Sequence, residues 1–155
     1  MKDMEVKKVI ENEITFMELV EKAKEVYNPR KISPFIEAGG VSAAILTEDN
    51  NIYTGVCIDT SCSLGMCAER NAIANMITNG ESKIKKLVCY CGTNIIGSPC
   101  GACREYLMQL NKESGNIEIL TNLKEMKTVR LKDLIPDWWG ARFGSRDQES
   151  NFVEI

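Results

Sequence analysis

The chain has 155 residues, 44% hydrophobic and 26% charged, as expected for one globular domain spanning 1–155 with a buried core. Its net charge of −3 argues against binding to nucleic acid or to an anionic membrane surface, so a small neutral substrate fits better. The absence of histidine excludes Ser-His-Asp and Cys-His catalysis and any histidine-ligated metal. Seven cysteines without an apolar leader or a membrane-length apolar run favour a cytoplasmic protein that uses thiols for metal binding or catalysis.

Hydrophobic periodicity predicts an alternation of helices and strands, flanked by loose tails at 1–12 and 145–155. The expected order is a helix over 15–27, a loop over 28–40, a hairpin of strands 41–47 and 52–58, a helix over 67–79, a strand over 84–91, a helix over 99–112, strands over 117–120 and 126–130, and one helical turn over 131–135. This order indicates an α/β sandwich with a mixed sheet.

Two short segments carry the predicted chemistry: Cys67-Ala68-Glu69-Arg70, and the run from Ser98 to Arg104. Cys100 and Cys103 have the spacing at which two thiolates on one turn bind the same ion. Pro99 suits the first position of a helix, where the dipole favours thiolate over thiol. Cys67 and Glu69 share a metal only if their helix meets it nearly end-on, which two helices starting at one ion achieve. Three thiolates with an open position beside a carboxylate are typical of a catalytic zinc site.

A Cys-x-Glu segment followed by Pro-Cys-x-x-Cys resembles the signature of the zinc-dependent cytidine deaminase superfamily. The closest resemblance is to its small cytidine deaminase and blasticidin S deaminase group, and it extends from about Val41 to Pro136. It implies a three-layer α/β/α sandwich with a five-stranded mixed sheet, in a homotetramer. It also implies one zinc ion per chain bound by Cys67, Cys100 and Cys103. Glu69 would move protons while cytidine or deoxycytidine becomes the uracil form with release of ammonia, a pyrimidine salvage reaction.

The same resemblance assigns the residues around the metal and the substrate. Arg70 would bond the ligand sulfurs, while Arg104 would either do the same or form a salt bridge on a solvated helix face. The substrate would contact the backbone of two residues and the side chains of two more: Ala68, Ser98, Cys57 and Asp59. Cys57 and Asp59 stand where the family has asparagine and glutamate, and Gly39 stands where it has a stacking phenylalanine.

The C-terminal aromatic residues have two open interpretations. Either they stack on the base, or they bury a subunit contact: Trp138, Trp139 and Phe143. Cys89 and Cys91 are expected to be buried as small hydrophobic residues, and Cys62 has no assigned task.

Other functions remain open at this stage. The altered substrate positions leave room for a blasticidin S-like nucleoside or another aminated heterocycle. A non-catalytic zinc fold is the second alternative, and the presence of Glu69 argues against it. A redox pair of Cys100 and Cys103 is the third, and Cys67 beside Glu69 argues against that.

Overall fold

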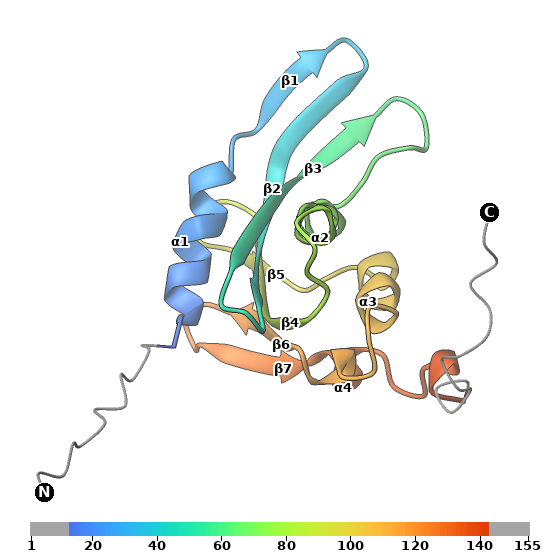
Figure 1. Ribbon diagram of the computed structural model, residues 1–155. Coiled ribbons are helices and arrows are strands. Elements are labelled where there is room, and N and C mark those ends of the chain that lie inside the picture. The colour runs from blue at the N-terminus through green and yellow to red at the C-terminus, as the bar shows by residue number, and fades with distance from the viewer. Residues whose placement is uncertain (1–12, 143–155) are drawn as a thin grey trace, which may run out of the picture.

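Residues 13–142 are the part of the chain that the computed structural model describes, and they form a mixed sheet with helices on both faces (Figure 1). The predicted tails at 1–12 and 145–155 lie outside the described residues. In chain order the elements are α1 (Phe16–Val26), β1 (Arg30–Ser33), β2 (Ile36–Thr47), β3 (Ile52–Thr60), α2 (Ala68–Thr78), β4 (Ile84–Tyr90), β5 (Ile96–Gly97), α3 (Gly101–Met108), the 3-10 helix η1 (Ser114–Asn116), β6 (Glu118–Asn122), β7 (Lys127–Arg130), α4 (Leu131–Leu134) and the 3-10 helix η2 (Trp139–Arg142).

The sheet contains the five predicted strands and two further short ones. Its order is β1-β2-β4-β6-β7, with β3 paired to β2 and β5 paired to β4. β4 and β6 are parallel, and the other pairs are antiparallel. The sheet is therefore mixed, as predicted.

The loop predicted over 28–40 is wrong, because most of this segment belongs to the sheet. β1 pairs with the first residues of β2, and β2 runs from Ile36 through Thr47 as one strand. Pro34 marks the tight turn between them, and the two glycines mark an irregularity inside β2. Proline and glycine thus signal a turn and a bulge here, and the pairing across the sheet keeps the residues around them extended.

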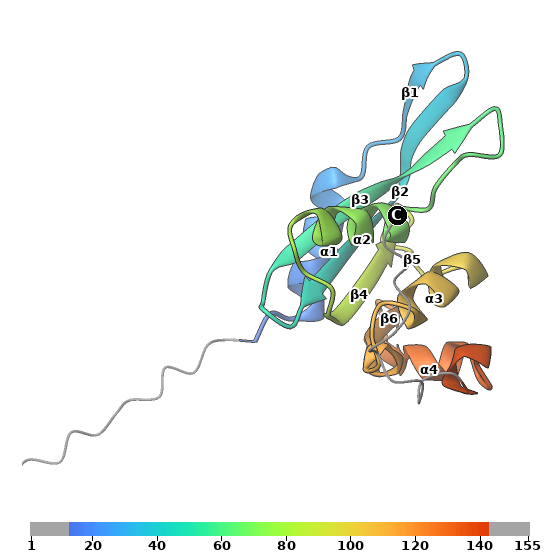
Figure 2. The same cartoon turned by 45° about the vertical axis from the view of Figure 1, so that its right-hand side comes forward.

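Helices cover the two faces of the sheet in separate layers (Figures 1 and 2). Along β2, Ala44 and Leu46 pack in one core with α1, while Ala43 and Ile45 pack in the other with α2 and α3. This alternation is the period of two of a strand that is buried on both faces. The predicted three-layer α/β/α sandwich is confirmed. No helix among residues 13–142 is long and apolar enough to cross a bilayer.

Candidate active site

The sheet topology brings two helix N-termini to one place. β3 and β4 both run antiparallel to β2, so their carboxyl ends lie at the same edge of the sheet. β3 leads into α2, whose N-cap is Cys67, and β4 leads through β5 into α3, whose N-cap is Cys100. Ligand sites in α/β proteins commonly lie at such an edge.

α3 differs in extent from the helix predicted over 99–112. Cys100 has the extended backbone of an N-cap residue, so the helix begins at Gly101 and Pro99 precedes it. The predicted placement of Pro99 at the first helical position is therefore wrong. The helix ends at Met108, and Gln109 is its C-cap. Cys100 thus caps the helix, while Cys103 lies in its first turn.

The sulfurs of Cys67, Cys100 and Cys103 lie within 4.8 Å of one another. The Sγ atoms of Cys67 and Cys100 are 3.6 Å apart. Tetrahedral zinc with Zn–S bonds of about 2.3 Å holds its sulfurs about 3.8 Å apart. The three cysteines therefore fit a zinc ion, and no further cysteine or carboxylate among residues 13–142 belongs to this group.

The thiols of this cluster have shifted pKa values. Burial raises the pKa of Cys103 strongly, and the nearby charge of Glu69 adds to the shift. Burial and Cys100 also raise the pKa of Cys67. Burial opposes ionisation of Cys100 too, but the backbone N–H of Cys103 and the neighbouring thiols outweigh it and lower the Cys100 pKa. The helix N-termini alone therefore do not turn all three thiols into thiolates, and a bound cation is what would complete their ionisation.

Glu69 lies beside these sulfurs at the buried end of a cavity of about 780 Å³. It belongs to the first turn of α2, and only 5% of its surface is exposed. Removing a carboxylate from water is costly, so a nearly buried one in the wall of a cavity indicates a function. The cavity wall also contains Cys67 and Cys100.

The family model for the cytidine and deoxycytidylate deaminase zinc-binding region matches residues 11–117. The chain belongs to this family. A cytidine deaminase of Sporosarcina psychrophila is 37% identical over 98 residues, which cover 62% of this chain and 71% of that protein. A cytidine deaminase of Mycoplasma genitalium is 33% identical over 95 residues, covering 60% of this chain and 73% of the relative.

Solved structures of cytidine deaminases have the same fold. The enzyme from Mycobacterium tuberculosis superposes with a TM-score of 0.67 at 26% identity, covering 82% of this chain and 98% of that chain. The enzyme from Burkholderia pseudomallei superposes with a TM-score of 0.65 at 27% identity, covering 80% and 98% of the two chains. The deaminase-like fold predicted from the paired motif is thus confirmed.

In this deaminase, the two arginines after the cysteine motifs act at different places. Arg70 Nη2 lies 4.0 Å from Cys67 Sγ, and the guanidinium pKa is raised chiefly by that sulfur. Arg70 Nε is buried and has no hydrogen-bond partner among the described residues. Arg70 thus places a positive charge and an unused N–H donor beside the sulfurs of Cys67 and Cys103, where a cluster of thiolates would carry negative charge.

Arg104 contacts neither a ligand sulfur nor a carboxylate among the described residues and instead binds backbone carbonyls. Its Nε donates to the carbonyl of Pro99 at 2.8 Å, and its Nη1 donates to the carbonyl of Leu134 at 3.0 Å. It therefore supports the backbone of the cysteine turn, and no sulfur or carboxylate among the described residues pairs with it. The proline and the helical turn at 131–135 were visible in the sequence, but their contact with Arg104 joins distant segments.

All four residues expected at the substrate line the cavity: Cys57, Asp59, Ala68 and Ser98. Ala68 is the first residue of α2, so its N–H has no intrahelical acceptor and is free to bind a ligand. Asp59 is exposed, whereas Cys57 is half-buried.

Gly39 cannot be exchanged for a residue with a side chain on this backbone. Its φ is +81°, and an added Cβ would lie 2.1 Å from the carbonyl oxygen of Asn28. An aromatic side chain at this position is therefore excluded by the bulge in β2.

The two tryptophans do not line the cavity. Both indole N–H groups donate to the carboxylate of Glu105 on α3, Trp138 to Oε2 and Trp139 to Oε1, each at 2.9 Å. The two indole rings contact each other, with their centroids 5.7 Å apart. Within the described chain they lie against α3 and not in the cavity beside the cysteine cluster. Phe143 lies outside the described residues.

Cys89 and Cys91, which were expected only to be buried as small hydrophobic residues, both line the cavity. Cys89 is buried as predicted, but it lies in the cavity wall, and burial followed by the Glu69 charge raises its pKa well above the usual value. Cys91 follows β4, is half-buried and also lines the cavity. The position of Cys91 at the end of the predicted strand over 84–91, shortly before Ser98, was the sequence signal that could have placed it at the site. Cys62 is an exposed thiol at the cavity mouth, 3.4 Å from the Thr60 hydroxyl.

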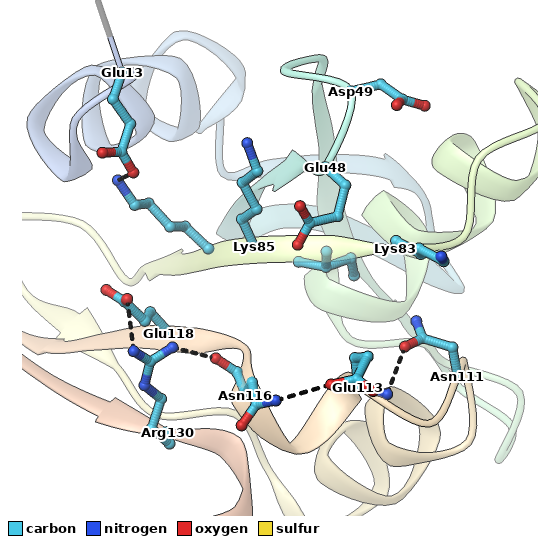
Figure 3. Close-up of a pocket in the computed structure, with 12 residues that line it drawn as sticks. Glu13, Glu48, Asp49, Lys83, Lys85, Asn111, Glu113, Asn116, Glu118 and Arg130 are labelled. Carbon is cyan, nitrogen blue, oxygen red and sulfur yellow. Dashed lines mark hydrogen bonds and ion pairs between the residues drawn. The ribbon is translucent and has the colours of Figure 1, made fainter.

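A second cavity of about 570 Å³ lies near the opposite ends of these strands (Figure 3). Four of its charged side chains form two ion pairs. Lys86 binds Glu13 at 2.9 Å, and Arg130 binds Glu118 at 3.1 Å. This cavity has no cysteine or unpaired buried group in its wall, so it offers no comparable chemistry.

Proposed function

We propose that this chain is a zinc-dependent hydrolytic deaminase that converts a cytosine nucleoside to its uracil form and releases ammonia. The observation that carries the proposal is the group of three sulfurs within 4.8 Å of one another, two of which belong to residues that line the same cavity as Glu69. Cytidine and deoxycytidine are the substrates proposed first, because the curated relatives are named cytidine deaminases.

Cys67, Cys100 and Cys103 would hold one zinc ion per chain. When bound, zinc would supply the Lewis acidity that makes water a nucleophile near neutral pH. Three thiolates carry one more charge than the ion neutralises, which opposes this effect. Arg70 offsets part of that excess through its contact with the Cys67 sulfur.

Glu69 is the group that moves protons in this proposal. Its carboxylate takes a proton from the attacking water as the new C4–O bond forms. It delivers this proton to the ring nitrogen. It then takes the proton of the new C4 hydroxyl and passes it to the departing amine, so that the C4–N bond breaks as the C4 carbonyl forms and ammonia is released. The N–H of Ala68 and the backbone of Ser98 orient the polar edge of the ring.

The cellular setting follows from the same reaction. We propose a role in pyrimidine salvage, in the cytoplasm, by a homotetramer. The family resemblance supports the salvage role and the homotetramer, and the free cysteines of the described chain fit a reducing compartment such as the cytoplasm.

Ammonia release from zinc-loaded protein tests the proposal directly. Cytidine, deoxycytidine and free cytosine are compared, together with a phosphorylated nucleoside as a control. We expect turnover of the nucleosides. Equal activity on free cytosine and cytidine would refute recognition of the sugar, and no release from any aminated heterocycle would refute the deaminase itself.

A further inference from the structure

The segment that leads into α2 folds back onto the end of β3. Ile58 and Met66 form an antiparallel bridge and exchange both backbone hydrogen bonds, each at 2.9 Å. Cys67 follows the bridge with an extended backbone. In an antiparallel ladder, the residues next to such a pair stand opposite each other without a hydrogen bond between them, and their Cα atoms are about 4.5 Å apart. On one side of this bridge that pair is Cys57 and Cys67.

Two observations support this pairing. On the other side of the bridge, Asp59 stands opposite Gly65, and a Cβ added to Gly65 would lie 3.6 Å from the Asp59 Cα. Cys57 and Cys67 both line the cavity, as expected for opposed residues whose side chains point to the same side. A disulfide needs Cα atoms roughly 4.4 to 6.8 Å apart, so this backbone can accept one without moving.

The two thiols have different partners in the reduced protein. Cys57 Sγ accepts a hydrogen bond from the Val41 N–H at 3.2 Å, and Cys57 lies outside the group of three clustered sulfurs. Cys67 belongs to that group, with its sulfur 3.6 Å from Cys100 Sγ. To reach the Cys67 sulfur, the Cys57 thiol has only to exchange its contact with Val41 for one across the bridge. A small reagent reaches both residues from the cavity.

We propose that Cys57 and Cys67 form a reversible disulfide, and that this disulfide competes with zinc for Cys67. The inference rests on the proposed zinc site and adds a means of regulating it. A low-molecular-weight disulfide is the oxidant: the Cys57 thiolate attacks it, forms a mixed disulfide and releases one small thiol. The Cys67 thiolate then attacks the Cys57 sulfur and displaces the second small thiol, so two protein thiols are oxidised as one reagent disulfide is reduced.

The disulfide would leave too few ligands for the metal. Only Cys100 and Cys103 remain of the group of three, whereas a catalytic zinc site uses three protein ligands. Zinc is therefore released as the bond forms, and a reductant restores the site. Disulfides in reducing compartments are usually transient and regulatory, which fits a bond of this kind.

The test exposes zinc-loaded protein to oxidised glutathione and measures released zinc with a chromogenic chelator. We expect loss of zinc together with a linked peptide pair that contains Cys57 and Cys67, and dithiothreitol with added zinc should reverse both. Cys57→Ser should slow zinc release about tenfold or more, because the attacking thiol is gone. Cys62→Ser removes an exposed thiol that lines the same cavity, and this matched control should release zinc like the wild type.

The other outcomes overturn the inference. Zinc release at an equal rate in Cys57→Ser, with Cys67 linked to Cys100, would mean that the clustered sulfurs oxidise among themselves. Zinc retained by the wild type, with glutathione attached to Cys57 alone, would show that the two thiols do not meet. Protein that binds no zinc at all would remove the proposed function, and peptide mapping of the oxidised metal-free chain would then decide the disulfide separately.

Discussion

Arg104 donates a hydrogen bond from Nε to the carbonyl oxygen of Pro99, 2.8 Å away, directly before the proposed ligand Cys100. The same guanidinium reaches Leu134 at the end of α4. A single side chain thus joins the cysteine turn to a segment 30 residues further along the chain. The position of Cys100 depends on this link, since its backbone is held from the preceding residue.

Removing this link should destabilise the fold and loosen the metal cluster. Arg104→Ala is expected to cost about 2 kcal/mol, because a half-buried, charge-assisted pair of hydrogen bonds is lost. Arg104→Lys should recover only part of it, because an ammonium does not reproduce the fork. Denaturant unfolding and zinc content measure both effects. Arg142→Ala, in an exposed pair with Asp137, is the control and should change stability by less than about 0.5 kcal/mol.

Glu69→Gln should separate catalysis from metal binding. The amide keeps the size of the side chain but cannot accept and return a proton, so the rate should fall about 100- to 10,000-fold. Zinc content should stay near the wild-type value, because Glu69 is not among the proposed ligands. Initial rates of ammonia release and elemental analysis decide this; an undiminished rate would remove Glu69 from the mechanism.

Chelation should abolish activity, and added zinc should restore it. A zinc ion that binds the folded state but not the unfolded state stabilises the protein by about 4 kcal/mol when the free zinc concentration is 1,000 times the dissociation constant. The melting temperature should therefore fall when the metal is removed. Cys67→Ser should lose metal, whereas Cys62→Ser should keep it. A protein that survives exhaustive chelation but loses activity on alkylation would instead be a thiol redox protein.

The metal cluster could be predicted from sequence because its geometry is largely local. Cys100 and Cys103 lie on one helical turn, and Cys67 and Glu69 open another. The way β3 and β4 bring these helices together follows from a fold shared across the family. Local spacing was therefore sufficient to propose the ligands, though not the exact start of α3.

The other details that escaped prediction depend on contacts between segments separated in the sequence. The glycines and prolines of residues 28–40 suggested a loop. The segment instead joins the sheet, because the bulge at Gly39 packs against Asn28 and because β2 pairs with β3. The orientation of Trp138 depends on Glu105, which lies on another element. Neither contact leaves a periodic signal in the sequence.

Gly55 allows α2 to lie directly against β3. A Cβ at this position would come within 2.3 Å of Ala72 N and 2.6 Å of Ala68 O. Gly55→Ala should therefore push α2 and its capping cysteine away, at a cost of about 3 kcal/mol, and reduce zinc content. Gly101→Ala, which meets no atom within 4 Å, is the matched control and should be as stable as wild type. Equal stability of the two variants in thermal unfolding would contradict this packing.

Glu81 makes the stability of the β2–β3 hairpin depend on pH. Its Oε1 accepts from Tyr53 Oη at 2.6 Å and from Asn51 Nδ2 at 2.7 Å. Hydrogen bonds, first from Thr47 and then from Tyr53 and Asn51, lower the carboxyl pKa below its ordinary value of 4.5. A lowered carboxyl pKa stabilises the fold at pH values above the unfolded-state pKa, and this contribution is lost as the pH falls through the folded-state pKa.

Glu81→Gln should thus be less stable than wild type at pH 7, and the difference should shrink between about pH 4.5 and pH 3. Urea unfolding across that range measures it, with Glu25→Gln, from an exposed pair with Lys22, as control. A difference between Glu81→Gln and wild type that stays constant with pH would show that the carboxylate charge plays no part in holding the hairpin.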